Sequence, residues 1–475
     1  MKFRIALLAL VLVSALSAAD RKLSALIIDG MNNHDWEAGT RAIRSTLEGT
    51  GRFRVDVATF PALKADFTGY DVVVNNFNGG HLADGKRWPR EVEVGLEKFV
   101  REGGGLVVFH AANNAFLQWP EYNQMIGLGW REKSFGAGLA VVNDKVVTVP
   151  QGSGLAPGHG PRHEFEMFVL DKAHPITSGL PAHWTHPAEQ LTHGQHGPAQ
   201  GVSVLTWAFS EVSHQGEPMD WVKSYGKGRV YTTMLGHTWK GEANPNLDDV
   251  SFQALVARGS EWAATGKVTL PADLGWKSLF NGKNLDGWEV RGDGVWSTMG
   301  DGSLFGQGLR PVKGGKIEHQ AWLYTKRNDF GEFDLHAEFW MPKYGNSGIS
   351  IRDTSRAHYA VDEPDSEHPE LVGPVHSTPA HIGYEIQIID DEAEQYPTGS
   401  VYLLDAAKTG RLRHTEWNSL DIESRNDVIR VKVNGELVSQ HPGEAGRSKV
   451  GPIGLQLHDR VSAILFRNIR IREIR

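Results

Sequence analysis

Residues 383–407 read GYEIQIIDDEAEQYPTGSVYLLDAA, and this stretch indicates the fold of the second half of the chain. From residue 384 to residue 389, apolar side chains alternate with Glu385 and Gln387. A period of two is typical of a β-strand with one apolar and one polar face. Pro397 and Gly399 mark a turn, and the apolar run SVYLL follows it. The stretch therefore predicts a strand, a turn and a second strand.

Neighbouring runs show the same alternation. SGISIRD (347–353) and IGLQLHD (453–459) each place polar side chains on one face, and EFDLHAEFW (332–340) follows the same period. If these polar faces line one sheet, they bring together a carboxylate, a cation, an imidazole and several hydrogen-bonding groups, a combination suited to catalysis. We expect a catalytic group of Glu385, His458 and Arg352, with Gln387, Gln456 and Ser350 binding substrate.

Short strands and turns dominate from residue 274 onward, which predicts an all-β sandwich over residues 274–475. Asn434 and Gly435 are typical of a hairpin turn. In AILFRNIRIREI the apolar residues change face near Arg467 and Asn468, which predicts a β-bulge there. Because bulges often re-aim a side chain beside a site, Arg467 is a further substrate-binding candidate. The polar run 358–381 predicts a long loop over one end of the sandwich.

Five motifs carry a family resemblance: FNGKNLDGW, SGISIR, GYEIQIIDDE, EWNSLDIESRNDVIRVKVNGELV and GPIGLQLHDRVSAILFRNIRI. Together they resemble the bacterial 3-keto-disaccharide hydrolase domain over residues 274–475. The resemblance implies a concanavalin-like β-sandwich (jelly roll) and cleavage of glycosides oxidised to a ketone at carbon 3. Such a ketone acidifies the hydrogen on carbon 2, so an enolate can form and expel the group on carbon 1, and water can then add.

That reaction needs a base, a partner for the oxyanion and an acid for the leaving group. Glu385 or His458 could be the base. Arg352 or a bound divalent cation could stabilise the oxyanion. The assignment of base and acid between Glu385 and His458 stays open.

Residues 22–267 alternate buried strand patterns with helix patterns, such as LSALIID before WEAGTRAIRSTLEG. This alternation predicts an α/β domain, a doubly wound and mostly parallel sheet with helices on both faces. Polar residues stand at or after the ends of the expected strands, where open α/β sheets bind ligands. We expect them to line a second pocket, together with one histidine of the NNHDW loop: Asp29, His34, Asn75, His110 and His237.

This half resembles the ThuA-like (trehalose utilisation) family through NNHDW, YDVVVNNFNGG, FVREGGGLVVFHAA, HPIT and SYGKGRVYTTMLGH. The resemblance implies a fold like that of class I glutamine amidotransferases (flavodoxin-like). Those enzymes use a cysteine nucleophile, and the chain has no cysteine, so an amidotransferase or cysteine hydrolase is excluded. No GxGxxG follows the first strand, which argues against a dinucleotide cofactor.

Seven histidines lie between residues 159 and 196. They could hold a metal, because neutral imidazoles are good ligands, or they could be polar loop residues beside the pocket. Whether the protein holds a metal therefore stays open.

The chain has 475 residues and a net charge of −8, which excludes a general nucleic-acid binder because no basic excess would neutralise phosphates. Residues 1–19 combine Lys2 and Arg4, a short apolar core and a Ser-Ala-Ala end. They predict a cleaved signal peptide, export to the periplasm or beyond, and no stable membrane insertion. Residues 268–273 form the expected linker.

Two functions fit these patterns. The first is an exported carbohydrate-processing enzyme that acts on 3-keto-glycosides. The second is a non-catalytic carbohydrate-binding protein whose α/β half is an inactive relative of the amidotransferases. In both, the expected partner is a carbohydrate.

Overall fold

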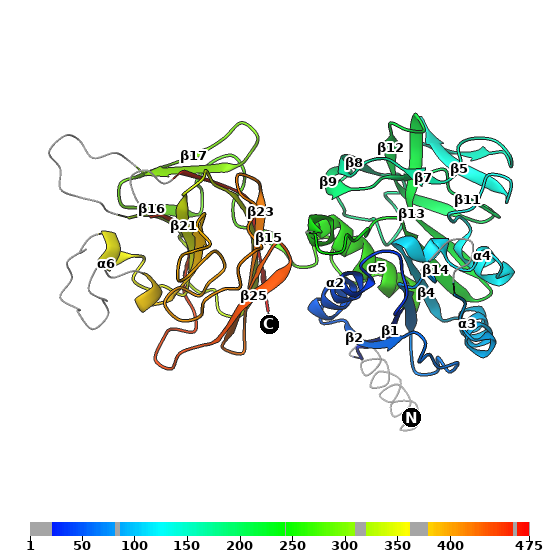
Figure 1. The fold of residues 1–475 in the computed structure, drawn as a ribbon, viewed down its shortest axis with the longest axis horizontal. Helices are drawn as coiled ribbons and strands as arrows, with labels where there is room; N and C mark the ends of the chain where they lie inside the picture. Colours follow the sequence, from blue (N-terminus) through cyan, green and yellow to red (C-terminus); the bar gives the residue numbers. More distant parts are fainter. Residues whose placement is uncertain are drawn as a thin grey trace, which may run out of the picture. The chain divides into compact units, whose positions relative to one another are not determined.

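A computed structural model describes residues 21–80, 86–242, 244–308, 320–361, 379–458 and 463–474. The chain separates into two compact units, Met1–Leu274 and Gly275–Arg475 (Figure 1). The predicted signal peptide lies outside the described residues. In the described part of the chain, no helix is both long enough and apolar enough to cross a membrane.

Five parallel strands form one half of the sheet of the first unit. In spatial order they are β2 (Phe53–Thr59), β1 (Leu23–Asp29), β3 (Val72–Asn75), β4 (Gly105–Phe109) and β14 (Gly228–Thr233). β1, β3 and β4 are buried along their whole length, as expected for apolar strands covered on both faces.

Helices cover these parallel strands. α2 (Trp36–Gly49) contacts α5 (Val250–Thr265), and both pack on the parallel strands. α3 (Arg90–Glu102) and α4 (Pro120–Ile126) lie on the opposite side of the sheet in Figure 1. The side chain of Asp35 accepts a hydrogen bond from the first turn of α2, so the loop after β1 ends in a capped helix.

The rest of this sheet is antiparallel, so the expectation of a mostly parallel sheet was wrong beyond the first five strands. Next to β14 come β13 (Gln215–Tyr225), β12 (Ser203–Ser210), β8 (His163–Val169) and β9 (His183–Glu189). The sheet also includes β5, β6 and β11 (Ala137–Val142, Lys145–Val149 and His196–Gly197). β7 and β10 (Gly158–His159 and Thr192–His193) pair separately. Two 3-10 helices, η1 and η2, span His110–Asn114 and Pro245–Asp248.

The described part of the second unit forms two antiparallel sheets. The larger sheet has the order β17-β18-β27-β20-β23-β24-β25, with β15 beside β27. Their bounds are Gly294–Thr298, Leu304–Gly308, Ala463–Glu473, Phe333–Trp340, Asn418–Arg425, Val428–Val433, Glu436–Pro442 and, for β15, Lys277–Ser278. The smaller sheet has the order β16-β19-β26-β21-β22, with bounds Trp288–Arg291, Ala321–Thr325, Ile453–Leu457, Asn346–Ile351 and Tyr384–Ile389.

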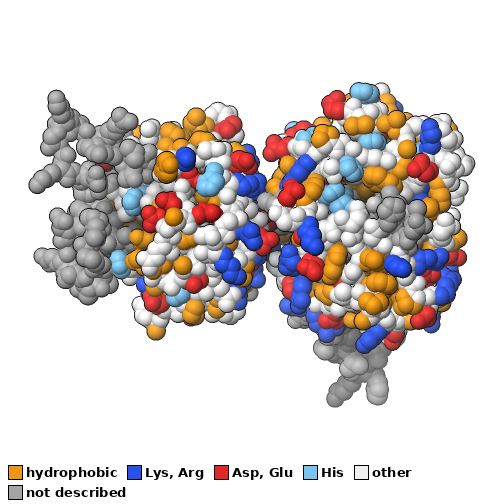
Figure 2. Space-filling view, viewed as in Figure 1, with side chains coloured by type: hydrophobic (Ala, Val, Ile, Leu, Met, Phe, Trp, Pro, Cys, Tyr) orange, Lys and Arg blue, Asp and Glu red, His pale blue; other side chains and the backbone are white. Residues whose placement is uncertain are grey.

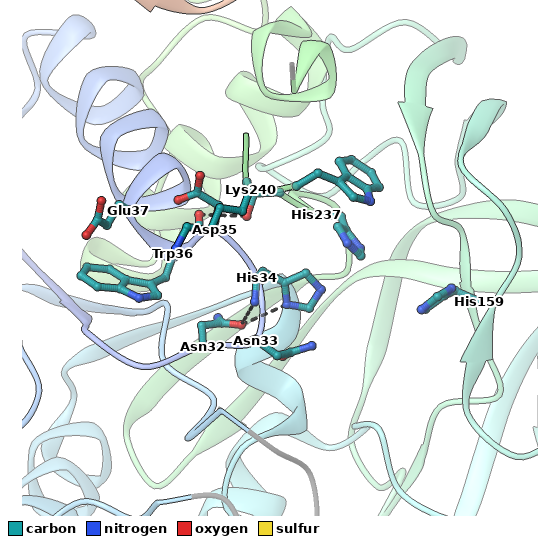
Figure 3. Close-up of a pocket in the computed structure, with 11 residues that line it drawn as sticks. Asn32, Asn33, His34, Asp35, Trp36, Glu37, His159, His237 and Lys240 are labelled. Carbon is teal, nitrogen blue, oxygen red and sulfur yellow. Dashed lines mark hydrogen bonds between the residues drawn. The ribbon is translucent and has the colours of Figure 1, made fainter. Parts of the chain in front are cut away.

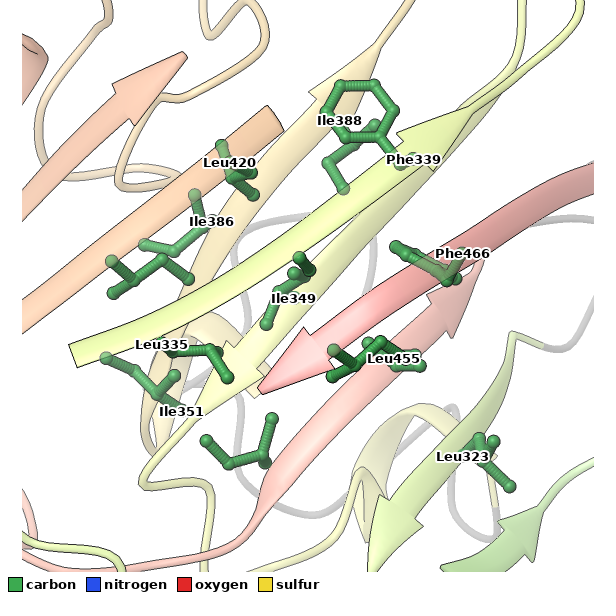
Figure 4. Close-up of a cluster of buried hydrophobic side chains, with 14 of the residues drawn as sticks. Leu323, Leu335, Phe339, Ile349, Ile351, Ile386, Ile388, Leu420, Leu455 and Phe466 are labelled. Carbon is green, nitrogen blue, oxygen red and sulfur yellow. The ribbon is translucent and has the colours of Figure 1, made fainter. Parts of the chain in front are cut away.

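Apolar side chains from the two sheets meet in one core (Figure 4). Ile349, Ile386 and Leu455 come from the smaller sheet, and Leu335 and Phe466 come from the larger one. All five are at most 1% exposed. The alternation expected for residues 384–389 is therefore confirmed, since Ile386 faces this core and its neighbours in sequence face away.

The predicted bulge in β27 is present. The pairing of β27 with β20 shifts register between His336 and Glu338, and Asn468 has a left-handed φ of 52°. Of the polar run 358–381, the structure describes only α6 (His358–Val361) and η3 (Pro379–His381). Over the described residues on the visible face, acidic and basic side chains are interspersed on each unit (Figure 2).

Candidate functional site

The smaller sheet of the second unit carries polar side chains on the face opposite the core. Glu385 on β22 pairs with Ser350 on β21, which pairs with Gly454 on β26, which pairs with Tyr324 on β19. Antiparallel pairing thus places Tyr324, Ser350 and Glu385 in one row across four strands, with a glycine between the first two.

A second row lies beside the first. Trp322 pairs with Gln456, and Gly348 pairs with Gln387. A methyl group at Gly348 would lie 3.1 Å from Glu385 Oε1 and 3.2 Å from Gln456 Oε1. The absence of a side chain at residue 348 therefore lets the carboxylate and the amide converge.

Side chains in these rows are buried, yet several of their polar atoms lack a partner. Glu385 is 2% exposed, and its Oε2 has no hydrogen-bond partner among the described residues. The same holds for Gln387 Oε1, Gln456 Oε1 and Ser350 Oγ. Because buried polar groups are nearly always hydrogen-bonded, four such atoms on one sheet face indicate a place that a polar ligand completes. We call Ser350, Glu385, Gln387 and Gln456 the Glu385 cluster.

Glu385 has the electrostatics of a proton acceptor. Burial, the largest cause, raises the pKa of its carboxyl to about 7, and Asp353 also raises it. His458 and the amide of Gln456 act in the opposite direction. The structure thus brings His458 within electrostatic reach of Glu385. A carboxyl group with a pKa near neutrality is suited to general acid–base catalysis.

Arg352 and Arg467 do not join the cluster. Arg352 has a φ of 58°, which ends the alternation of β21, and its guanidinium lies near the Gly331 carbonyl and Asp427. Arg467 lies on the larger sheet, where it bonds Glu338 at 2.5 Å and stacks on Trp417. The roles expected for these two residues, oxyanion stabilisation and substrate binding, therefore have no support from their positions.

Sequence reasoning missed several residues in or next to the cluster. Tyr324 donates a hydrogen bond of 2.6 Å to Asp353, and Asp353 is fully buried. Trp322 stacks on Tyr324, and Val361 of α6 packs against the cluster that these rings form with Ala357. Gly348 was also overlooked, although an isolated glycine in a strand pattern indicates a close approach of another group.

A cavity of about 470 Å³ lies in the first unit, at the carboxyl ends of the parallel strands (Figure 3). Its walls come from the loop after β1, from the segment after β14 and from β7. The lining is polar with two indole rings and consists of Asn32, Asn33, His34, Asp35, Trp36, Glu37, His159, His237, Thr238, Trp239 and Lys240.

His34, His110 and His237 converge beside this cavity. One ligand atom of each imidazole lies within 4.8 Å of those of the other two. The ring centroids of His34 and His237 are 4.2 Å apart, and those of His110 and His237 are 5.0 Å apart. Within the described part of the chain, these residues form the group that could hold a metal ion.

Asp29, Asn75 and His110 do not line the cavity, although the sequence led us to expect them there. The ring of His110 lies next to that of the lining residue His34, with the centroids 4.9 Å apart. The carboxylate of Asp29 accepts hydrogen bonds from Thr40 and Thr59 at 2.7 and 2.8 Å. Asn75 donates to the hydroxyl of Tyr122. Both strands end at the expected edge, but their last side chains point toward neighbouring elements, where they connect the sheet to α2 and α4.

The histidine-rich stretch does not form one cluster. His186 is buried against Glu189 at 2.8 Å, and His196 lies against the carbonyls of Gly136 and Leu155. His159 alone of this stretch lines the cavity, with its ring centroid 6.1 Å from that of His237.

Comparison with known proteins gives two family matches. The family described as trehalose utilisation (ThuA) matches residues 24–263, which is half of the chain. The 3-keto-alpha-glucoside-1,2-lyase-like domain matches residues 275–472. No curated protein matches the chain.

Solved structures give further matches. A presumed ThuA-like protein from Parabacteroides merdae is 35% identical, with a TM-score of 0.49, over 52% of this chain and 92% of that one. A presumed glycosyl hydrolase from Parabacteroides distasonis is 22% identical, with a TM-score of 0.33, over 42% and 95%. The carbohydrate-binding module CBM66 from Bacillus subtilis is 14% identical, with a TM-score of 0.27, over 39% and 96%.

Proposed function

Because the chain belongs to the ThuA family through its first unit and carries a 3-keto-glucoside lyase-like domain in its second, we propose that it is an exported carbohydrate-processing enzyme. In this proposal the second unit cleaves 3-keto-glycosides at the Glu385 cluster. The observation that carries the proposal is the buried carboxylate of Glu385, which has a pKa of about 7. One of its oxygens, like several polar atoms around it, has no hydrogen-bond partner among the residues that the structure describes.

The reaction begins with removal of the hydrogen on carbon 2, which the ketone at carbon 3 acidifies. We assign this step to Glu385, because a base works best when its pKa lies near the working pH. The electron pair of the broken C–H bond moves into the enolate, and the proton goes to the carboxylate. The amide of Gln387 is our candidate donor to the enolate oxygen, in the place that Arg352 does not reach.

The enolate then expels the group on carbon 1, so a C1–C2 double bond forms as the C1–O bond breaks. The leaving oxygen takes a proton, for which His458 is our candidate donor. Addition of water across the double bond gives net hydrolysis, and the released 1,2-unsaturated ketone is the product if water does not add. Asp353 and Tyr324 position the neighbouring strands and need not exchange protons.

We also propose the finer fold assignments that the resemblances imply. The order β2-β1-β3-β4-β14 of the parallel strands supports a flavodoxin-like arrangement in the first unit. The two antiparallel sheets around one core support a concanavalin-like sandwich in the second.

The test gives the full chain a 3-keto-glucoside and the unoxidised glucoside side by side and follows product with time. We expect product from the 3-keto compound alone. In Glu385→Gln the rate should fall by roughly a hundredfold or more, which is the usual contribution of a general base. Glu436→Gln, at an exposed hairpin position, is the matched control and should keep full activity.

Equal rates on both sugars would indicate an ordinary glycosidase instead. Binding of both sugars without any product would favour the carbohydrate-binding alternative. An unchanged rate in Glu385→Gln would remove Glu385 from the mechanism.

A further inference from the structure

We propose that the first unit binds a divalent transition metal of the Zn²⁺ class through His34, His110 and His237, with open coordination positions that face the cavity. This site is separate from the Glu385 cluster and does not depend on the function proposed for it. Its ligand would be a small polyhydroxylated or keto compound that coordinates through two adjacent oxygens.

The three imidazoles come from separate loops that meet at one edge of the sheet. His34 lies in the loop after β1, His110 directly after β4, and His237 after β14. Zn–N bonds are about 2.0–2.1 Å long, so two ligands of one ion lie at most roughly 4 Å apart. The three ligand atoms now lie within 4.8 Å of one another, so small rotations of the rings would bring them to the spacing that one ion requires.

Hydrogen bonds orient two of the rings for metal binding. His110 Nδ1 lies 2.6 Å from the carbonyl oxygen of Met234, and His34 Nδ1 lies 3.0 Å from Asn32 Oδ1. Since both partners are acceptors, each Nδ1 carries the hydrogen and each Nε2 keeps a free lone pair. An imidazole that donates its other N–H to a carbonyl is the usual arrangement of a metal-bound histidine.

The backbone supports the same conclusion. His110 has a φ of 44°, a left-handed conformation that is costly for a residue with a side chain and that persists where the surroundings impose it. The amide of His237 donates to Glu189 Oε1 at 3.0 Å, which fixes the start of its loop. The surrounding structure therefore holds His110 in a costly backbone conformation, and a buried carboxylate holds the backbone of His237.

The three rings are also in mutual contact. The ring centroid of His34 lies 4.9 Å from that of His110 and 4.2 Å from that of His237. A neutral imidazole offers a nitrogen lone pair to a metal ion, so one cation between the rings would join them favourably.

A set of three protein ligands is typical of catalytic rather than structural zinc, because it leaves positions for water or substrate. Here those positions face a cavity large enough for a small molecule. Asn33, Asp35 and Lys240 supply hydrogen-bonding groups, and Trp36 supplies a flat apolar surface that suits a sugar-like ring. The ring of Trp239 stacks on that of His237, with their centroids 4.1 Å apart. Figure 3 shows His159 approaching from the other side of the cavity.

The first experiment measures metal binding by the full chain after treatment with a chelator and dialysis. We expect about one Zn²⁺ per chain in a calorimetric titration, and a visible d–d absorption band when Co²⁺ is added. Loss of a residue that hydrogen-bonds to a metal ligand typically weakens metal binding by roughly 10–100-fold. His34→Ala and His237→Ala each remove a ligand itself, so each should weaken binding by more than that. Asn32→Ala removes only the hydrogen-bond partner of His34, so its loss of metal affinity should lie within that range.

His183→Ala is the matched control, because the His183 side chain is 66% exposed and pairs with Glu166 on the β8–β9 ladder. It should bind Zn²⁺ and Co²⁺ as the unaltered chain does. Circular dichroism checks that each variant is folded. Absence of binding in the unaltered chain would overturn the metal site. So would an affinity in His34→Ala and His237→Ala as high as that of the unaltered chain.

The second experiment tests the open positions. Acetohydroxamate, a small ligand with two adjacent oxygens, is added to the Co²⁺ form of the full chain. A saturable change in the d–d band supports open positions facing the cavity. A band that does not respond would show a closed, structural site and overturn the proposed ligand class.

Discussion

Glu385 shows how a single buried carboxyl group can favour chemistry at the expense of stability. Its pKa rises from 4.5 to about 7, chiefly because burial penalises the charged form. Since one pKa unit corresponds to about 1.4 kcal/mol, holding this group ionised costs the fold roughly 3 kcal/mol above pH 7. Replacing it with an uncharged residue would remove that cost, so a carboxyl group at this buried position favours a role in the site over a role in stability.

The rate of 3-keto-glucoside cleavage should depend on pH through Glu385. A base must be deprotonated, so we expect kcat/KM to rise between pH 5 and about pH 7. His458, Asp353 and Gln456 interact with this carboxyl group. The profile is measured from pH 5 to 9, with Glu436→Gln as control. A rate that falls across this range would contradict the assignment of Glu385 as base.

Gly348→Ala tests whether the cluster depends on close approach. The added methyl group would lie 3.1 Å from Glu385 Oε1, so the carboxylate and Gln456 would have to move by a few tenths of an ångström. We expect at least a severalfold lower kcat/KM with little change in thermal stability, because a misplaced catalytic group loses rate readily. Gly300→Ala is the control, because a methyl group there meets no atom within 4 Å. Equal activity in both variants would show that the convergence is incidental.

At the scale of elements, the bulge in β27 is maintained by one carboxylate. Glu338 on β20 accepts hydrogen bonds from Arg467 at 2.5 Å and from Asn468 at 2.6 Å. Burial alone would raise the pKa of Glu338, but His336 and Arg467 outweigh it and bring the pKa to about 2. Arg467 is thus a structural residue of the larger sheet, and the sequence pattern located its bulge without revealing this partner.

Glu338→Gln should destabilise the protein, by an amount that depends on pH. The pKa is depressed in the folded state, so the stabilisation is present above about pH 4.5 and disappears as pH falls toward 2. We expect a loss on the order of 2–3 kcal/mol at pH 6 and a smaller loss at pH 3, measured by denaturant unfolding. Glu436→Gln should change little at either pH. A loss that is the same at both pH values would argue against an ionic role.

At the scale of the whole molecule, the protein combines two units with different chemistry. The first presents converging imidazoles beside a cavity, and the second presents a buried carboxylate on a sheet face. Imidazoles suit a metal that polarises oxygen, whereas an isolated carboxylate suits proton abstraction. The two units therefore present groups that suit different kinds of reaction.

Export is the prediction that concerns the whole chain. The charged start, short apolar core and Ser-Ala-Ala end of residues 1–19 predict cleavage before Asp20. N-terminal sequencing of protein purified from its native host should begin at Asp20. Mature protein that retains Met1 would contradict export by a cleaved signal peptide.

Local patterns in the sequence were sufficient to locate many of the elements. The apolar runs at Leu23–Asp29 and Gly105–Phe109 are strands, and the pattern at Trp36–Gly49 is a helix. The alternation at Tyr384–Ile389 also placed Glu385 and Gln387 opposite the core. These features depend on neighbours within one element, where backbone geometry dictates which side chains share a face.

The tertiary structure decided which of these faces and loops meet. Pairing across β19, β26, β21 and β22 brought Gln456 and Ser350 to Glu385, whereas the left-handed φ of Arg352 turned its side chain elsewhere. His34, His110 and His237 converge only because β1, β4 and β14 end at the same edge of the sheet. Contacts between segments that lie far apart in the sequence, such as those of His34 and His237, depend on strand order and register, which no local period encodes.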